Sequence, residues 1–468
     1  MREDLLFAGV EALTEATTAG NLSARELTEA CLDRISETDH HLHAFTNVMR
    51  DRALAEADAR DKDIIDGVEP GPLHGLPVAV KEEVDVAGEV TTFGGRGNST
   101  PAVRDAEVVR RLRAAGAVVL GKTAMPEFGQ WPFTESATHG ITRNPWDTDR
   151  STGGSSGGTA AAVAAGMVPV GIGGDGGGSI RIPAAVCGLF GLKPHRGRVS
   201  TDPHQHLWWA LGTVGPLTRS VVDSALVYDV VHGALPGDRF RAQDPATSFV
   251  EAVRAPARTL RIAWSARPVT LGVRPHPEHV EAVRATAALL ADLGHHVEEV
   301  DPGYPDPTSA FVPQFFAGVA SEARTVEHPQ RLERRTRETL RLGRWVRPGV
   351  VEWAMRQGEK VAERANRVFE RHDLLLTPTI AHRPPHAGVL DGVGTLRAAA
   401  LSTPMIAYTA LWNVTGNPAA SVPAGFGSDG LPLAVQLVGR GHDETTILAV
   451  AAQLERARPW AGRRPVLP

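Results

Sequence analysis

Residues 151–183, STGGSSGGTAAAVAAGMVPVGIGGDGGGSIRIP, constrain the fold of this chain more than any other stretch. They contain two glycine-flanked serines, Ser155 and Ser179, on either side of the run AAAVAAGMVPVGI. A flexible Gly/Ser linker does not explain this pattern, because the run between the serines predicts a helix followed by a buried strand. Ordering so many glycines loses much conformational entropy. We therefore expect backbone N–H groups here to lie close to a bound or reacting group.

The segments around this stretch predict an α/β fold. Residues 78–80 form a short apolar run that predicts a buried strand, and Lys81 stands where this strand ends. A helix is expected at 105–115 and another buried strand at 117–123. Strands that alternate with helices predict a central mixed β-sheet covered by helices on both faces. Further strands are expected at 261–265, 373–379, 420–426 and 433–439, and helices at 8–60, 277–294 and 443–457.

The chain shows neither an internal repeat nor a clear linker, so one large domain is expected over 1–468. Within it we distinguish an N-terminal helical part at 1–70 and a core with the chemical motifs at 71–235. A variable, arginine-rich helical segment on the substrate side is expected at 300–370.

Charge and cysteine content limit the partners and the compartment. The formal net charge of −5 and a pI of about 6.4 argue against a nucleic-acid or anionic-membrane partner. Cys31 and Cys187 form neither a disulfide framework nor a metal-ligand spacing, which favours a reducing compartment. No signal-peptide core and no apolar run of membrane-spanning length is found. We expect a cytoplasmic protein without a metal, and a homodimer is left open.

Lysine is rare in this chain. Only five of the 49 basic residues are lysines, so arginine is the default base. A lysine in apolar sequence then suggests a role that arginine cannot fill, and the clearest such role is to lose a proton. Lys81 follows the apolar run 78–80 and has this setting.

Several enzyme motifs can be tested against the glycine-rich stretch. GGSSG at 153–157 matches the nucleophile elbow of α/β-hydrolases, but that motif follows an apolar strand and the preceding WDTDRSTGG is polar. The phosphate-binding and zinc-protease motifs are absent from the sequence. What remains is a serine nucleophile activated by a lysine whose pKa is lowered by burial. A second serine would relay the proton, and the GGGS run at 176–179 would supply N–H donors to an oxyanion.

Eight motifs, in this order along the chain, resemble the amidase signature family. They are GLPVAVKEEVDVAG, GKTAMPEFG, RNPWD, GGSSGGTAAAVAAG, GGDGGGSIRIPAAVCGLFGLKP, GPLTRS, LLLTPT and NVTGNPAASVPAGFGSDGLPLAVQLVG. The resemblance covers nearly the whole chain and implies the amidase signature fold.

The resemblance implies a Ser–cis-Ser–Lys triad. In it Ser179 is the nucleophile, Ser155 is the relay serine after a cis peptide bond, and Lys81 is the base and later the acid. It implies hydrolysis of a linear or cyclic carboxylic amide through an acyl-enzyme that releases ammonia or an amine, without a cofactor. The expected partner is a small-molecule amide. The backbone of four residues would form the oxyanion hole: Gly176, Gly177, Gly178 and Ser179.

Other residues receive supporting roles by the same resemblance. Ser156 is expected to be a loop hydrogen-bonder, and Asp175 and Arg181 are expected to orient the loop of the nucleophile. Four aromatic residues are candidate walls of the substrate pocket, and each is equally a candidate core residue: Trp131, Phe315, Phe316 and Trp412.

The chain departs from the commonest family pattern at three places. The usual GTDTGGS is GGDGGGS at 173–179, which predicts a looser loop or a wider pocket. Glu82 stands where many relatives carry aspartate. Ile182 stands where glutamyl-tRNA amidotransferase A subunits often carry glutamine, which weakens that alternative. An esterase or acyltransferase using the same acyl-enzyme, and a non-catalytic assembly subunit, are the remaining alternatives.

Overall fold

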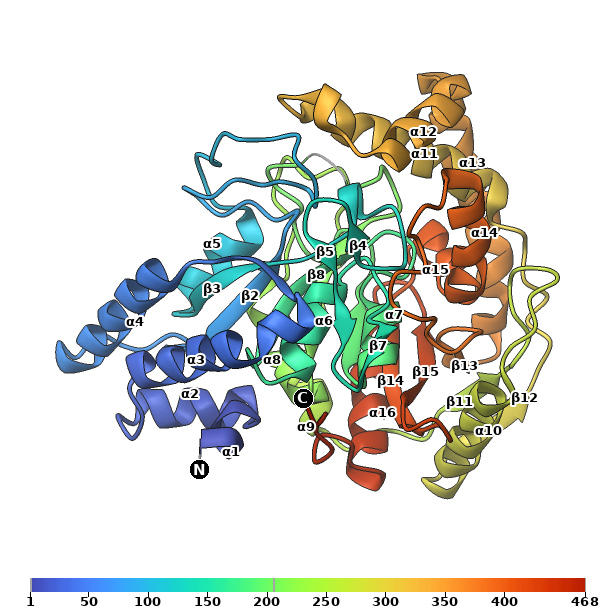
Figure 1. Ribbon diagram of the computed structural model, residues 1–468. Helices are drawn as coiled ribbons and strands as arrows, with labels where there is room; N and C mark the ends of the chain where they lie inside the picture. The colour runs from blue at the N-terminus through green and yellow to red at the C-terminus, as the bar shows by residue number, and fades with distance from the viewer. Residues whose placement is uncertain (1, 205–206, 468) are drawn as a thin grey trace.

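A mixed β-sheet runs through the centre of the protein (Figure 1). The computed structural model describes residues 2–204 and 207–467, and in these residues the sheet has 11 strands. Their order is β1 (Phe45–Val48), β3 (Val118–Thr123), β2 (Pro77–Lys81), β8 (Val170–Asp175), β10 (Thr213–Thr218), β9 (Phe190–Lys193), β14 (Ala419–Phe426), β15 (Pro432–Gly439), β13 (Leu374–Pro378), β11 (Arg261–Trp264) and β12 (His296–Glu299).

The sheet combines parallel and antiparallel pairs. β2 lies parallel to both β3 and β8, whereas β10 runs antiparallel to β8 and β9. Because β2 and β8 are parallel neighbours, their carboxyl ends lie at the same edge of the sheet. Lys81 ends β2 and Asp175 ends β8, so this pairing brings the two chemical motifs together.

Helices flank the sheet, as predicted, and this confirms the α/β fold. Among the central ones, α6 packs against β8, α7 against β9 and β14, α8 against β10, and α16 against β15. The helices are α1 (Arg2–Leu6), α2 (Val10–Thr18), α3 (Ala24–Leu42), α4 (Arg50–Ile65), α5 (Glu107–Ala114), α6 (Gly157–Ala164), α7 (Arg181–Cys187), α8 (Val221–Val231), α9 (Phe249–Arg254), α10 (Pro277–Asp292), α11 (Thr308–Thr325), α12 (Arg334–Leu342), α13 (Pro348–Ala365), α14 (Thr395–Ile406), α15 (Ala410–Thr415) and α16 (Glu444–Ala457). Ser23 is the N-cap of α3, and it forms a capping box with Glu26.

One strand departs from the prediction that residues 8–60 are helical. β1 (Phe45–Val48) pairs antiparallel with β3 and forms an edge of the sheet. Its sequence, FTNV, is too short to show a period of its own, and only the contact with β3 makes it a strand.

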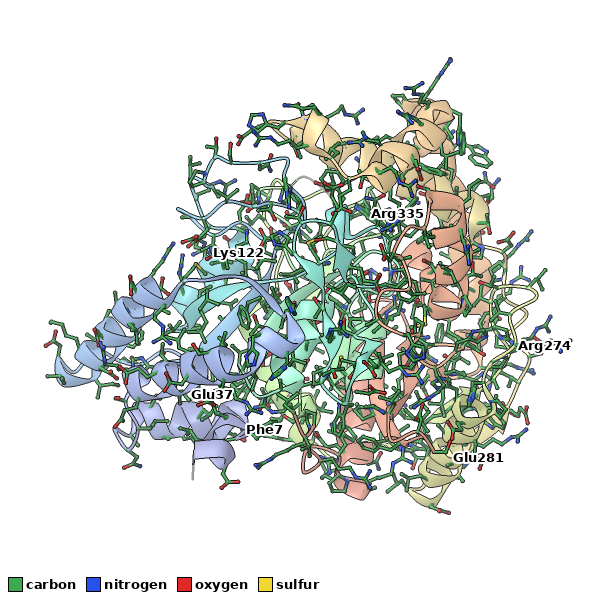
Figure 2. The ribbon with its side chains drawn as sticks, in the orientation of Figure 1. Phe7, Glu37, Lys122, Arg274, Glu281 and Arg335 are labelled. Atoms are coloured by element: carbon green, nitrogen blue, oxygen red, sulfur yellow. The ribbon has the colours of Figure 1, made fainter. Side chains whose placement is uncertain are left out.

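Residues 300–370 form a helical layer beside the sheet. α11, α12 and α13 pack on one another, and in Figure 1 they lie at the upper right of the molecule. Two residues near α10, Arg274 and Glu281, are exposed at the outer edge in Figure 2, whereas Lys122 on β3 is fully buried.

None of the helices in the described part of the chain is long and apolar enough to cross a membrane. Cys31 and Cys187 are both buried, and neither forms a disulfide. Burial raises the pKa of the Cys187 thiol, which keeps it protonated.

Candidate active site

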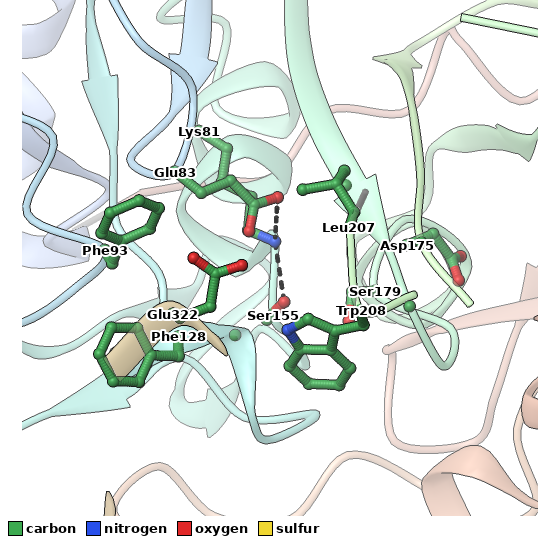
Figure 3. A pocket seen from close by; sticks show the side chains of 14 residues that line it. Lys81, Glu83, Phe93, Phe128, Ser155, Asp175, Ser179, Leu207, Trp208 and Glu322 are labelled. Carbon is green, nitrogen blue, oxygen red and sulfur yellow. Dashed lines mark hydrogen bonds and ion pairs between the residues drawn. The ribbon is translucent and has the colours of Figure 1, made fainter. Parts of the chain in front are cut away.

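Lys81 and Ser155 lie in direct contact. The Lys81 side chain is buried at the end of β2, with 1% of the residue exposed, and its Nζ donates a hydrogen bond of 2.8 Å to Ser155 Oγ (Figure 3). The Gly154–Ser155 peptide bond is cis. The structure therefore brings together the two residues that the sequence predicts as base and relay.

Ser179 lies on the loop after β8 and borders the same cavity as Lys81 and Ser155. The two serine loops are joined by the N–H of Ser156, which donates a 3.2 Å hydrogen bond to the carbonyl of Ser179. Ser156 Oγ donates to the carbonyl of Gly174 at 3.1 Å and accepts from its N–H at 3.3 Å. These contacts place Ser156 between the two loops rather than in the cavity.

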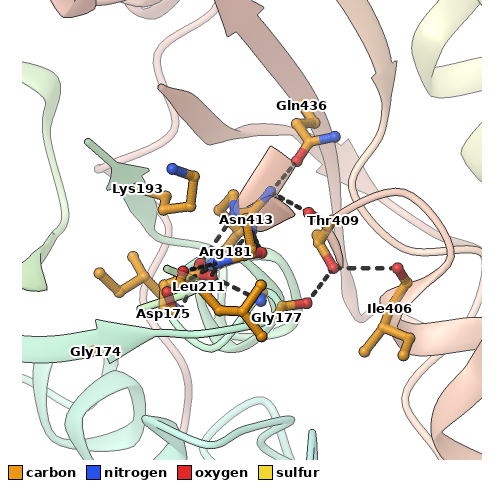
Figure 4. A network of polar contacts seen from close by, with 12 residues as sticks. Gly174, Asp175, Gly177, Arg181, Lys193, Leu211, Ile406, Thr409, Asn413 and Gln436 are labelled. Carbon is orange, nitrogen blue, oxygen red and sulfur yellow. Dashed lines mark hydrogen bonds and ion pairs between the residues drawn. The ribbon is translucent and has the colours of Figure 1, made fainter. Parts of the chain in front are cut away.

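Asp175 and Arg181 form a buried ion pair under the loop of Ser179 (Figure 4). Arg181 Nη2 lies 3.0 Å from Asp175 Oδ1, and both side chains are fully buried. Asn413 donates to Asp175 Oδ1 at 2.8 Å, while Arg181 donates to Gln436 Oε1 at 2.8 Å and to the Thr409 carbonyl at 3.1 Å. The ion pair thus connects the loop of Ser179 to α15 and β15 by hydrogen bonds.

The ionisation of Asp175 follows from this pair. Burial by itself raises the pKa of the carboxyl, but the Arg181 guanidinium and the hydrogen bonds from Arg181 and Asn413 outweigh it and hold the pKa well below its ordinary value. Asp175 is therefore a permanent carboxylate, and its role is to shape the loop.

One of the four predicted oxyanion-hole donors has another partner. The N–H of Gly178 donates a 2.7 Å hydrogen bond to Asp175 Oδ1, so it is not free for an oxyanion. The φ of Gly178 is +129°, and a Cβ there would overlap the Thr409 side chain. The prediction for Gly178 is corrected accordingly, because the glycine is needed for the loop conformation. Gly176, Gly177 and Ser179 remain as candidate donors.

Glu83 is a neighbour of Lys81 that sequence reasoning missed. Its Oε1 lies 3.0 Å from Lys81 Nζ, and the Glu83 side chain is 17% exposed (Figure 3). The residue stands two positions after Lys81, but the spacing alone did not show that the chain turns back after β2. Glu82, in contrast, turns toward Lys122, with 3.5 Å between Oε1 and Nζ.

The cavity of Lys81 has strained aromatic walls. It has a volume of about 30 Å³, and Phe93, Phe128 and Trp208 border it. All three have positive φ angles, of 52°, 55° and 49°. Bulky residues rarely adopt this backbone conformation, and such strain is concentrated at functional sites. The remaining lining residues are Lys81, Glu83, Gly129, Ser155, Gly174, Asp175, Gly176, Ser179, Leu207, Gly212 and Glu322.

A second and larger cavity also borders Ser179. Its volume is about 330 Å³ and its walls are mainly apolar. Three of the predicted pocket residues line it, namely Trp131, Phe315 and Phe316. α11 also contributes Phe311, which the sequence analysis did not single out because its helical spacing is equally typical of a core residue.

Trp412 lies elsewhere, which corrects its expected place in a pocket wall. It is 1% exposed and packs against Phe369 and Tyr304 in a separate core cluster. It lines neither cavity at Ser179. A lone tryptophan in an apolar sequence gives no signal of whether it faces a pocket or the core.

Within residues 2–204 and 207–467, no cluster of three or more His, Cys, Asp or Glu side chains is arranged to hold a metal ion. The expectation of a reaction without a metal or cofactor stays a prediction.

Comparison with known proteins agrees with the geometry. The amidase family model matches residues 26–448. The AmiB2 protein of Mycobacterium tuberculosis is 48% identical over 465 residues, covering 99% of this chain and 98% of that protein. The structure of 6-aminohexanoate cyclic dimer hydrolase complexed with substrate is 34% identical with a TM-score of 0.92, covering 98% of this chain and 99% of the other. A bacterial aryl acylamidase is 29% identical with a TM-score of 0.87, again over 98% and 99%.

The family model matches nearly the whole chain, and a buried lysine contacts a serine beside a glycine-rich loop. These two observations lead to one assignment. The chain belongs to the amidase signature family and is an amide-hydrolysing enzyme.

Proposed function

We propose that the enzyme hydrolyses amides of a bulky apolar acid, with Ser179 as the nucleophile, Ser155 as the relay and Lys81 as the base. The observation that carries the proposal is the 2.8 Å hydrogen bond from Lys81 to Ser155 in a cavity that Ser179 also borders. A buried amine hydrogen-bonded to a hydroxyl is the arrangement that proton transfer requires.

The first half of the reaction forms the acyl-enzyme. Ser179 Oγ attacks the carbonyl carbon while its proton passes to Ser155 Oγ, and the Ser155 proton passes to Lys81 Nζ. The carbonyl oxygen becomes an oxyanion that accepts hydrogen bonds from backbone N–H groups of the loop. We assign these donors to Gly176, Gly177 and Ser179, because Gly178 is bonded to Asp175.

The tetrahedral intermediate then loses the amine. The C–N bond breaks, the nitrogen takes a proton from Ser155, and Lys81 returns its proton to Ser155. Water then attacks the acyl carbon, while one of its protons passes to Ser155 Oγ and the Ser155 proton passes to Lys81 Nζ. The Ser179–acyl bond breaks, Ser179 Oγ takes a proton from Ser155, and Lys81 returns its proton to Ser155. Lys81, Ser155 and Ser179 are thus restored to their starting protonation states.

The larger cavity supports the acyl preference. Its volume of about 330 Å³ and its aromatic walls fit an aryl or long alkyl group, since burial of such groups is the main source of binding free energy. Ser179 borders this cavity, whereas Ser155 and Lys81 do not. We therefore assign the acyl group to this cavity, which the proton relay residues do not line.

Labelling with a fluorophosphonate probe, followed by peptide mapping, tests the nucleophile. The expected label is on Ser179, and it is lost in Lys81→Ala. A label on Ser155 or Ser156 that survives Lys81→Ala would contradict the triad. Comparing the rates on an amide and an ester of one acid then measures how far the enzyme favours amides.

The cellular location and the oligomeric state of the protein are two further predictions. We propose a cytoplasmic location, because the chain has only two cysteines, Cys31 and Cys187, and both are buried outside any disulfide. Fractionation of cells that produce the protein tests it. The homodimer left open by the sequence stays a prediction, and light scattering would measure the oligomeric state.

A further inference from the structure

Two carboxylates face the small cavity beside Lys81. Glu83 follows β2, and Glu322 lies near the end of α11, so the two come from segments far apart in the chain. Figure 3 shows the Glu322 carboxylate on the side of Lys81 and Glu83, between these residues and Phe128. A reaction that needs only the triad does not account for a second carboxylate here.

One carboxyl group at this cavity has no polar partner in the part of the chain that the structure describes. Asp175 is paired with Arg181, and Glu83 is paired with Lys81. Among the described residues, the side-chain carboxyl group of Glu322 has neither a hydrogen-bond nor an ion-pair partner. When Lys81 is uncharged, as a base must be, Glu83 also lacks a counter-ion. The cavity then has two carboxyl groups, Glu83 and Glu322, without a cation beside them.

Without a cation in the cavity, the surroundings of Glu322 favour its protonated form at neutral pH. Burial, together with the nearby Glu83 and Asp85 carboxylates, raises the pKa of Glu322 to about 8. A cation that enters the cavity would favour the ionised form, because an opposite charge nearby stabilises a carboxylate.

The small cavity lies on the leaving-group side of the scissile bond. The proton donor to the leaving nitrogen has to be within hydrogen-bond reach of it. Ser155, which we assign as that donor, borders the small cavity and not the large apolar one. The amine therefore departs past Lys81, Glu83 and Glu322.

The size and walls of the cavity fit a small ammonium group. A volume of about 30 Å³ admits a group the size of a water molecule or an ammonium head. Phe93, Phe128 and Trp208 supply aromatic surfaces, which attract cations through the negative potential of their faces.

We propose that Glu83 and Glu322 are specificity-determining residues that bind a small ammonium group on the leaving side of the amide. This inference rests on the acyl-enzyme reaction proposed above. The ammonium is either the ammonia released from a primary amide, after protonation, or a second amine on a short leaving group. In both cases it competes with Lys81 for Glu83 and so frees the lysine to act as the base.

Three amides of phenylbutanoic acid test the proposal: the primary amide, the N-aminoethyl amide and the N-propyl amide. The last two have leaving groups of the same size and differ in charge. We would measure kcat/KM for each with the wild type, Glu322→Gln and Glu83→Gln. Glu359→Gln, a substitution on the exposed face of α13, is the matched control.

A preference of about tenfold or more for the N-aminoethyl over the N-propyl amide supports an ammonium carried by the substrate. The preference should fall toward one in Glu322→Gln and stay in Glu359→Gln. If the preference is instead for the primary amide, ammonium chloride should inhibit the wild type competitively and tetramethylammonium should not. That inhibition should weaken in Glu322→Gln, which supports released ammonium as the source.

The proposal is overturned if the ratios among the three amides are the same in the wild type, Glu322→Gln and Glu83→Gln. Failure of the catalytic proposal looks different, because the fluorophosphonate would then not label Ser179, whatever the ratios among the three amides. Circular dichroism spectra of the variants would confirm that each is folded.

Discussion

A Cβ atom at Gly174 would overlap Oε1 of Glu83, so the glycine on β8 and the glutamate beside Lys81 fit each other. The usual family pattern has threonine at this position of the loop, and the glycine leaves the space that Glu83 occupies. Gly176 also stands where the usual family pattern has threonine, and it lies against the ring of Trp208. A Cβ atom built on Gly176 would be 3.2 Å from Cε3 of Trp208. The extra glycines thus accommodate two side chains of the cavity rather than simply widening it.

Gly174→Ala should destabilise the protein by about 1–3 kcal/mol, since overpacking of a buried site forces neighbouring atoms to move. The effect should nearly vanish when Glu83→Ala is combined with it, because the overlapping carboxylate is gone. Urea unfolding of the two single variants and the double variant measures this coupling.

Gly237→Ala is the control for this cycle, because a Cβ at Gly237 has open space around it. We expect it to change the unfolding free energy by less than about 0.5 kcal/mol in either background. Additive effects of Gly174→Ala and Glu83→Ala would show that the two residues are not coupled.

Lys81→Arg should lower kcat by about 10²–10⁴-fold, the range that a general base contributes. Arginine keeps the positive charge next to Glu83, but a guanidinium does not give up its proton. Steady-state kinetics with phenylbutanamide measure the effect. Activity within a few-fold of the wild type would show that Lys81 contributes charge rather than basicity.

Asp175→Asn should lower the free energy of unfolding by about 3–5 kcal/mol, because Arg181 would be left as an unpaired buried charge. The pKa of Asp175 is lower in the folded than in the unfolded protein, so its contribution is complete above the unfolded value and is lost as the pH falls toward the folded value. The difference in stability between wild type and variant should therefore narrow from about pH 5 to pH 3. Urea unfolding as a function of pH tests this, and a constant difference would contradict it.

Phe311→Ala should lower kcat/KM for phenylbutanamide by about 10–100-fold while acetamide is affected much less, since only the larger acyl group reaches this wall. Phe7→Ala, which removes a partly buried phenylalanine far from the site, is the matched control. Equal losses on both amides would place the acyl group elsewhere.

Trp412→Phe should reduce stability by about 1–3 kcal/mol and leave the KM for phenylbutanamide nearly unchanged, because Trp412 packs in the core. Trp131→Phe should instead change KM, as Trp131 lines the acyl cavity. Thermal unfolding and steady-state kinetics of the two variants separate the roles. A large change of KM in Trp412→Phe alone would reverse the assignment.

The sequence by itself determined the elements and the order of the motifs. Apolar runs such as 78–80 and the glycine-flanked serines are local patterns, and backbone preferences act over the same short range. This is why β2, α6 and β8 were predicted close to their observed bounds, and why Lys81, Ser155 and Ser179 could be named as candidates.

Tertiary structure decided which residues surround these candidates. Glu322 of α11 lines the same cavity as Lys81 of β2 only because the fold brings these distant segments together, and no local pattern encodes that arrangement. The burial of Trp412 and the bond between Gly178 and Asp175 likewise depend on how separate segments meet. Side-chain burial and charge pairing are set by contacts across the fold, so they follow from packing rather than from spacing along the chain.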